Sequence, residues 1–174
     1  LYIAFKQSRK ISTDSRQVFP GSMFFALKGD NFDGNKYAEQ ALKAGASVAV
    51  IDDPAFKSEG TVLVEDVLSS LQQLANMHRR QFNIPVVAIT GSNGKTTTKE
   101  LVNSVLSQIY KVTATKGNLN NHIGVPLTLL QINDETEMAI IEMGANHQGE
   151  IEQLCKIAEP THGLITNIGK AHLG

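Results

Sequence analysis

The sequence predicts an α/β protein in two parts, a small N-terminal α/β domain over residues 1–84 and the truncated beginning of a parallel-sheet nucleotide-binding domain over residues 85–174. Two observations predict this. From Val86 onward, short apolar runs alternate with helical patterns, which is typical of a parallel sheet covered by helices on both faces. A glycine-rich phosphate-binding loop (P-loop), Gly91-Ser92-Asn93-Gly94-Lys95-Thr96, stands between the first apolar run and the first helical pattern.

In the N-terminal part, short apolar runs around one helical pattern predict a small sheet. Strands are expected at residues 23–27, 47–51 and 61–64, and a helix at 37–44 that Gly45 ends as a C-cap. Asp66 is expected to cap a second helix that runs to about Phe82. The stretch Asn83-Ile84-Pro85 ends that helix and marks the predicted domain boundary.

After the boundary, strands and helices alternate. Strands are expected at 86–90, 112–115, 138–143 and 163–167, and helices at 96–108, 123–130 and 150–158. The chain stops at Gly174, directly after a strand pattern, so we expect a fragment that ends inside its second domain.

Composition excludes several classes of function. The 174 residues are 41% hydrophobic and carry a formal net charge of -1 with scattered basic residues, so nucleic acid binding is not expected. The single cysteine, Cys155, rules out a disulfide framework and a cysteine-rich zinc site within this chain. No apolar run is long enough to span a bilayer, and the first residues are too weakly apolar for a signal peptide. A cytoplasmic monomer without membrane contact is expected.

The glycine-rich loop predicts a bound nucleotide. Gly91 and Gly94 allow the backbone to curl so that successive N–H groups face one anion at a helix start. Lys95 can reach the β and γ phosphates, and the Thr96 hydroxyl can join Mg²⁺ coordination. Ile89 stands where the usual pattern has a further glycine, so the loop is a shortened variant. The alternative is a glycine turn before an ordinary helix.

Other polar residues follow strand ends, where open α/β sheets bind ligands. Glu142 is either a Mg²⁺ ligand or a solvated glutamate. His147 and His172 could reach the same edge, although surface histidines fit their spacing equally. The stretch 118–121 is either a ligand loop or a helix cap. In the N-terminal part, polar turns at 13–16 and 28–34 could hold a second phosphorylated ligand or be solvated.

These residues together resemble the Mur ligases of bacterial cell-wall synthesis over essentially the whole chain, and within that family the branch that adds D-alanyl-D-alanine. The loop itself is shared with the wider superfamily, which includes folylpolyglutamate synthase. The segments at 118–121 and 142–146 look specific to the branch. The resemblance rests on Ile11–Arg16, Asp33-Gly34, Thr90–Thr97, Gly117–Asn121, Ile123–Thr128, Glu142–Asn146 and Asn167–Leu173.

The resemblance implies a role for each segment. The N-terminal domain would bind the uridine diphosphate end of UDP-N-acetylmuramoyl-tripeptide, through Thr13, Asp14, Ser15, Arg16, Lys28, Asp33 and Gly34. The second would bind ATP through Gly91, Ser92, Asn93, Gly94, Lys95, Thr96 and Thr97, with Asn146 and His147 near the γ-phosphate. The peptide would lie toward Thr115, Asn118, Asn120 and Asn121. Thr96, Glu142 and His172 would hold Mg²⁺, and Lys95, Glu142 and His172 would be catalytic.

The implied reaction is ATP-dependent amide formation through an acyl phosphate, with D-alanyl-D-alanine as the acceptor and ADP as a product. In this family a carbamylated lysine, the adenine contacts and a C-terminal domain would lie beyond Gly174, so the chain alone is not expected to turn over. Two alternatives stay open. One is another ligase of the superfamily, such as the tripeptide-forming Mur ligase. The other is a non-catalytic nucleotide-binding module, although no Asn-Lys-x-Asp guanine-reading motif is present.

Overall fold

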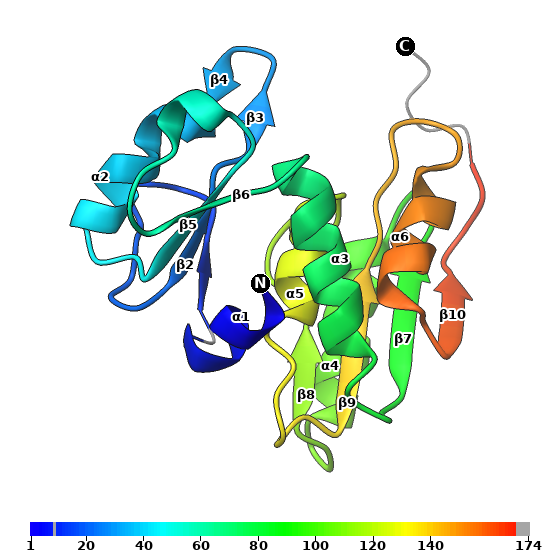
Figure 1. Cartoon of the computed structure of the whole chain (residues 1–174). Coiled ribbons are helices and arrows are strands. Elements are labelled where there is room, and N and C mark those ends of the chain that lie inside the picture. Colours follow the sequence, from blue (N-terminus) through cyan, green and yellow to red (C-terminus); the bar gives the residue numbers. More distant parts are fainter. Residues whose placement is uncertain (9, 170–174) are drawn as a thin grey trace. The chain divides into compact units, whose positions relative to one another are not determined.

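The computed structural model describes residues 1–8 and 10–169 (Figure 1). The chain divides into two compact units, Leu1–Leu74 and Ala75–Gly174. This division falls inside helix α3 (Val67–Arg79), whereas the functional boundary after residue 84 stays a prediction. Among the described residues, none of the helices combines the length and apolar character that a membrane crossing needs.

The first unit is built on a four-stranded parallel sheet of order β1-β2-β5-β6 and a separate antiparallel hairpin, β3-β4. Its core contains Phe24, Ala49 and Ile51 of the sheet with Ala38 and Ala41 of α2. The elements are α1 (Tyr2–Ser8), β1 (Ile11–Ser12), β2 (Met23–Phe25), β3 (Lys28–Gly29), β4 (Phe32–Asp33), the 3-10 helix η1 (Gly34–Tyr37), α2 (Ala38–Lys43), β5 (Val48–Ile51), the 3-10 helix η2 (Pro54–Phe56) and β6 (Thr61–Leu63).

Both predicted helix ends in this unit are formed by the predicted residues. Gly45 follows α2 with φ +107°, and its N–H and that of Ala46 donate to the carbonyls of Leu42 and Ala41, which is a Schellman motif. The Asp66 carboxylate accepts the N–H of Ser69 at 2.6 Å and so caps α3. The elements α1, β1 and the β3-β4 hairpin were not predicted, because each is too short to show a periodic pattern.

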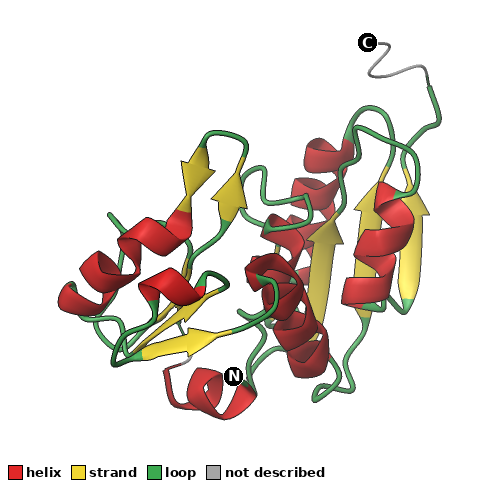
Figure 2. Cartoon of the chain, turned by 45° about the horizontal axis from the view of Figure 1, so that its top comes forward, coloured by secondary structure: helices red, strands yellow, loops and turns green. Residues whose placement is uncertain are grey.

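The second unit is a four-stranded parallel sheet of order β10-β7-β9-β8. Helix α4 packs on β7, β8 and β9, whereas α5 and α6 contact each other and the sheet. Right-handed crossovers between parallel strands place helices on both faces of the sheet, and Figure 2 shows helices on both faces. The elements are β7 (Val86–Thr90), α4 (Lys95–Leu106), β8 (Val112–Ala114), α5 (Gly124–Leu129), β9 (Met138–Glu142), α6 (Glu150–Ala158) and β10 (His162–Ile165).

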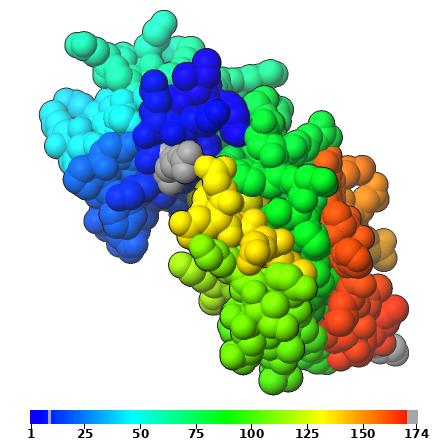
Figure 3. All heavy atoms as spheres, turned by 90° about the horizontal axis from the view of Figure 1, so that it is seen from below, coloured from blue at the N-terminus to red at the C-terminus, as the bar shows by residue number. Residues whose placement is uncertain are grey.

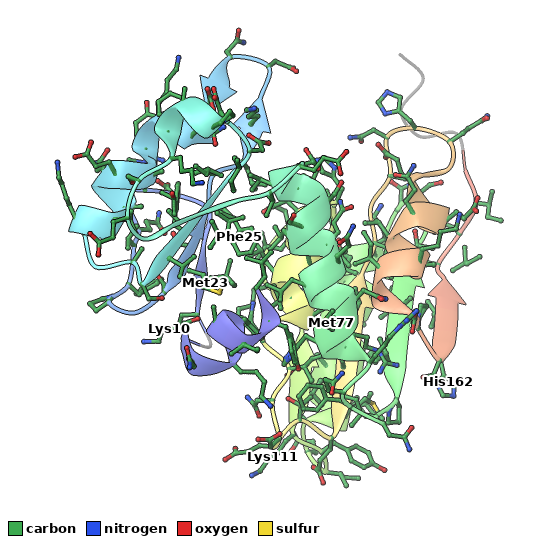
Figure 4. The ribbon with its side chains drawn as sticks, in the orientation of Figure 1. Lys10, Met23, Phe25, Met77, Lys111 and His162 are labelled. Atoms are coloured by element: carbon green, nitrogen blue, oxygen red, sulfur yellow. The ribbon has the colours of Figure 1, made fainter. Side chains whose placement is uncertain are left out.

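All four strands of this sheet point the same way, so the loops that follow them gather at one edge. Lys111 and His162 mark the opposite, amino-terminal edge (Figure 4). Strand β10 is an edge strand with exposed side chains, and the red segment that contains it lies on the surface (Figure 3). The candidate phosphate loop, Glu142 and the 118–121 stretch all belong to the carboxyl edge.

Gly34 offers a test of packing in the first unit. A Cβ at this buried position would lie 2.4 Å from the Leu27 carbonyl oxygen and 2.5 Å from the Ala26 carbonyl carbon, which are backbone atoms that cannot move aside cheaply. We expect Gly34→Ala to destabilise the unit by about 1–3 kcal/mol, the usual cost of overpacking. Urea unfolding followed by circular dichroism measures the change.

The control is Gly29→Ala in the adjacent β3-β4 hairpin, because a Cβ there would meet no heavy atom within 4 Å. It should unfold close to the parent midpoint. Equal midpoints for both variants would contradict the packing argument.

Candidate functional site

The loop between β7 and α4 requires both of its glycines, for different reasons. Gly94 has φ +78° and open space around it, so only its backbone conformation demands glycine. Gly91 has φ +138°, and a Cβ there would lie 2.1 Å from the Thr166 hydroxyl. Helix α4 begins at Lys95 without a side-chain cap. Because the first N–H groups of a helix lack intrahelical acceptors, the N–H groups at this start are available to an anion.

Residues that follow β10 brace the loop. The Asn167 carbonyl accepts the Ser92 N–H at 3.1 Å, and its side-chain oxygen accepts the Asn93 N–H at 3.0 Å. The Asn167 amide and the Thr166 hydroxyl both donate to the Asn93 carbonyl, at 3.0 and 2.6 Å. The N–H groups of Ser92 and Asn93 therefore already have acceptors within the protein, whereas successive loop N–H groups were expected from the sequence to face one anion. Thr166 and Asn167 were missed as site residues, although both follow a strand at the same edge.

Lys95 lies against the loop that it follows. Its ammonium donates to the Gly91 carbonyl at 2.7 Å and to the Ser92 carbonyl at 3.3 Å, so its positive charge lies directly over the curled backbone. Thr96 and Thr97 are exposed in the first turn of α4. An anion held by the helix start would meet the Lys95 charge as well.

Glu142 is the last residue of β9 and is fully buried. Its Oε1 accepts the Thr96 hydroxyl at 3.1 Å and the Asn120 amide at 2.8 Å. Its Oε2 is buried and has no hydrogen-bond partner among the described residues. The solvated alternative for Glu142 is therefore wrong. A buried carboxylate oxygen without a donor is costly unless a cation compensates it, so the site fits a bound metal ion.

The donor set suits Mg²⁺ better than a transition metal. In the described part of the chain, no group of three or more histidine, cysteine, aspartate and glutamate side chains is placed to hold a metal ion. A carboxylate and a threonine hydroxyl are oxygen ligands, and Mg²⁺ commonly takes one or two of these and fills its shell with water and phosphate oxygens. The predicted third ligand, His172, lies outside the described residues.

The residues of the 118–121 stretch make different contacts, and ligand binding by this stretch stays a prediction. Asn120 lies beside the buried carboxylate, because its amide donates to Glu142 and its carbonyl accepts the Gly144 N–H at 2.8 Å. Asn121 instead caps α5, since its side-chain oxygen accepts the N–H groups of Ile123 and Gly124 at 3.1 and 2.9 Å. Asn118 is exposed in the turn.

Asn146 and His147 follow β9 but are tied to α6. Their N–H groups donate to one oxygen of Glu150, at 2.6 and 3.1 Å. These backbone hydrogen bonds lower the pKa of the Glu150 carboxyl. Both residues are exposed, and the hydrogen bonds within the described part of the chain do not connect them to the phosphate loop.

In the first unit, the turn after β1 is organised by Ser12, Asp14 and Arg16. The buried Ser12 hydroxyl donates to the carbonyls of Asp14 and Gln17. Arg16 makes a two-point ion pair with Asp14, with Nε–Oδ1 at 2.9 Å and Nη2–Oδ2 at 2.8 Å. The Arg16 side chain is 82% exposed, so the guanidinium also faces solvent. Thr13 and Ser15 are half-buried in the same turn.

A buried asparagine, Asn35, lies near Lys28 and Asp33 and was not predicted as a site residue. The Asn35 amide donates to Asp33 and to Asp52, both at 2.8 Å, and its oxygen accepts the Asp52 N–H at 3.0 Å. The Lys28 ammonium lies 2.8 Å from Asp52. Burial raises the pKa of the Asp52 carboxyl, but hydrogen bonds from Lys28 and Asn35 outweigh it and leave that pKa below its ordinary value. Gly34 is buried and shapes this turn without an exposed surface of its own.

The Asp14–Arg16 pair predicts a measurable pKa. The Arg16 hydrogen bonds lower the pKa of Asp14 from 3.8 to about 2. Because the pKa is lowered in the folded state, the contribution of the pair is present above the ordinary value and is lost as the pH falls through about 2. We expect Arg16→Ala to return the Asp14 pKa toward 3.8, measured by carboxyl NMR titration.

The control is Arg80→Ala, which removes a different arginine that pairs with Glu159. It should leave the Asp14 titration unchanged. A low Asp14 pKa that persists in Arg16→Ala would show that backbone hydrogen bonds, rather than the guanidinium, set it.

Two family models cover the chain. The model described as "Mur ligase family, catalytic domain" matches residues 8–94, and the one described as "Mur ligase middle domain" matches residues 89–174. Curated relatives named UDP-N-acetylmuramoyl-tripeptide--D-alanyl-D-alanine ligase include those of Synechocystis sp., 48% identical over 167 residues, and of Bacillus subtilis, 42% identical over 167 residues. Both alignments cover 94% of this chain, and 37% and 36% of the relatives.

Solved structures agree. A crystal structure of MurF from Acinetobacter baumannii is 44% identical with a TM-score of 0.90, and covers 95% of this chain and 37% of that one. MurF ligase from Thermotoga maritima, solved in complex with ADP, is 37% identical with a TM-score of 0.87, and covers 96% of this chain and 39% of that one. The chain thus spans little more than a third of the length of these relatives. With both family models matched and a conserved fold, the chain belongs to the Mur ligase family.

Proposed function

We propose that this chain supplies the uridine-nucleotide and ATP-binding parts of an ADP-forming ligase that joins UDP-N-acetylmuramoyl-tripeptide to D-alanyl-D-alanine. The single observation that carries the proposal is the buried Glu142 carboxylate, with one oxygen unpaired, beside the first turn of the phosphate-loop helix. Relatives that carry this activity in their names include those of Synechocystis sp. and Rickettsia prowazekii, which are 48% and 37% identical to the chain. The tripeptide-forming alternative is less well supported, because the 2,6-diaminopimelate ligase structure is only 20% identical and shares the fold alone.

The chemistry explains why a phosphate site is needed. A carboxylate resists attack by an amine because its charge repels the nucleophile and its oxygen is a poor leaving group. Transfer of the γ-phosphoryl group of ATP to the terminal carboxylate of the peptide gives an acyl phosphate and ADP. The amine of D-alanyl-D-alanine then attacks the acyl carbon, loses a proton and displaces phosphate, which leaves an amide.

The first step brings two anions together, so the protein must neutralise charge as it develops. Lys95 and the N–H groups at the start of α4 would hold the β and γ phosphates. Glu142 and the Thr96 hydroxyl would hold Mg²⁺, with His172 as a further proposed ligand. When bound, Mg²⁺ screens the phosphate oxygens and withdraws electron density from the transferring phosphorus. Asn120 orients the Glu142 carboxylate through Oε1 and leaves Oε2 for the metal.

The other proposed contacts rest on the family relationship, and their residues are at least partly exposed except Gly34 and Thr115. The Arg16 guanidinium and the Lys28 ammonium are the cations of the first unit that we assign to the uridine diphosphate, together with Thr13, Asp14, Ser15 and the Asp33-Gly34 turn. Asn146 and His147 are assigned to the γ-phosphate side, Thr97 to the phosphate loop, and Thr115, Asn118 and Asn121 to the peptide side. A cytoplasmic, monomeric enzyme is part of the same proposal.

Lys95→Met tests the assignment of ATP to the second unit. In a ligase that carries this sequence at the full length of its relatives, we expect ligation to fall by at least about 10³-fold, because charge stabilisation in phosphoryl transfer is lost. Binding of the uridine nucleotide should stay within about twofold, since Lys95 is not in that unit. Phosphate release measures ligation, and calorimetric titration with UDP measures binding of the uridine nucleotide.

Lys111→Met is the matched control, because Lys111 is exposed at the opposite edge of the sheet (Figure 4). It should keep full activity. A parallel loss of UDP binding in Lys95→Met would overturn the assignment of the two nucleotides to separate units.

Glu142→Gln tests the metal site. Without Mg²⁺ the variant should unfold at or above the parent temperature, because a neutral amide replaces a buried charge. With Mg²⁺ and ADP the parent melting temperature should rise, and the affinity for Mg²⁺ should fall by about tenfold or more in the variant. Differential scanning fluorimetry gives the melting temperatures, and calorimetry gives the affinity for Mg²⁺.

The control is Glu152→Gln, which removes the carboxylate of an exposed ion pair on α6. An unchanged affinity in Glu142→Gln would remove this carboxylate from the metal site.

A further inference from the structure

Lys99 is an unusual residue in α4, because only 1% of it is exposed. Burial of an ammonium group is costly unless hydrogen bonds compensate it. Its Nζ donates to the Thr115 carbonyl at 2.8 Å and to Glu100 at 2.5 Å. The Glu100 side chain is 61% exposed, so water screens that pair. Thr115 directly follows β8 and is buried, and its carbonyl is the partner that ties Lys99 to the interior.

The backbone hydrogen-bond ladder between β8 and β9 loses its regular pattern at Thr115. Its N–H donates to the Ile140 carbonyl at 3.0 Å, as a parallel ladder requires. The next rung of that ladder would join the Glu142 N–H to the Thr115 carbonyl. The Glu142 N–H donates instead to the Thr115 hydroxyl, at 2.9 Å, while the carbonyl accepts from Lys99. The two oxygens of Thr115 therefore hold Lys99 on one side and the backbone of Glu142 on the other.

Helix α4 consequently reaches Glu142 by two routes. Thr96 contacts the Glu142 carboxylate directly, at 3.1 Å. Lys99, three residues further along the same face of the helix, acts on its backbone through Thr115. The first route fixes a carboxylate oxygen and the second fixes the N–H from which the side chain extends. A shift of Thr115 would move both the backbone and the carboxylate relative to the phosphate loop.

We propose that Lys99 is a positioning residue of the metal and phosphate site, which sets the place of Glu142 by holding the Thr115 carbonyl out of the strand ladder. Lys99 does not touch the reacting atoms. The expected effect on catalysis rests on the proposed function. The link between Lys99, Thr115 and Glu142 rests on the hydrogen bonds described above.

The test uses Lys99→Met, Thr115→Val and the double variant in the full-length ligase. Lys99→Met keeps the stem of the side chain and removes its donors, and Thr115→Val keeps the shape and removes the hydroxyl. We expect each to weaken Mg²⁺ binding in the presence of ADP by about threefold to thirtyfold and to lower kcat, with the KM for ATP within about twofold. The double variant should be no worse than the poorer single variant, because both act on one link.

A second readout does not depend on metal or activity. Hydrogen exchange at the Glu142 amide, followed by mass spectrometry of the peptide around it, should accelerate in Lys99→Met. Glu100→Gln is the control, since it removes the exposed partner and leaves the Thr115 contact; its exchange and Mg²⁺ affinity should match the parent. Should Lys99→Met fail to fold, Lys99→Gln, which is shorter and uncharged, takes its place in the same comparison.

Multiplying effects in the double variant, or an unchanged Glu142 exchange rate, would overturn the positioning role. A lower melting temperature with unchanged Mg²⁺ affinity would overturn it too, because Lys99 would then be merely structural. Failure of the proposed function has a different signature. In that case Glu142→Gln itself leaves Mg²⁺ affinity unchanged, while the exchange rate at Glu142 still responds to Lys99→Met.

Discussion

The second unit is organised around one buried charge. Glu142 is carried into the interior by β9, and its carboxylate has two donors for one oxygen and no donor among the described residues for the other. Such a group is tolerated only where its neighbours are fixed, because an ion in a dry interior loses its hydration. Thr96 after β7 and Asn120 after β8 supply the donors. Three loops from three different strands must therefore meet at one carboxylate, and the order of the parallel sheet makes this possible.

The conformation of the shortened phosphate loop depends on the residues that follow β10. With Ile89 in place of a further glycine, the loop has less freedom to curl by itself. Thr166 and Asn167, which follow β10, contact the backbone at Gly91, Ser92 and Asn93 instead. Only a glycine at position 91 leaves room for that approach. The proposed anion site is thus shaped by the segment after β10 as much as by the glycines, and the helix start at Lys95 would supply the remaining donors.

Patterns along the chain predicted the parts of this structure that depend on neighbours in sequence. The alternation after Val86, the turn at Gly45, the cap at Asp66 and the position of Glu142 at a strand end are all local signals, and each is confirmed. Contacts between distant residues left no such signal. Asn35 pairs with Asp52 across seventeen positions, and a single sequence does not record that pairing. Asn120 and Asn121 are adjacent and chemically identical, so only the path of the turn decides which one faces Glu142 and which one caps α5.

Lys99 shows why charge alone misleads such predictions. On an amphipathic helix a lysine is usually predicted to face solvent. Lys99 is buried instead, and an apolar side chain at this position could not donate a hydrogen bond. The chain must leave the strand ladder after Thr115 so that Asn120 can reach Glu142, and Gly117, with φ +56°, lies in the turn that follows. Leaving the ladder frees a buried carbonyl that needs a donor. A long cationic side chain from α4 supplies that donor without an additional loop. Burying the ammonium costs free energy, but it satisfies the carbonyl that the turn removes from the ladder. The same turn brings the Asn120 amide to the buried carboxylate.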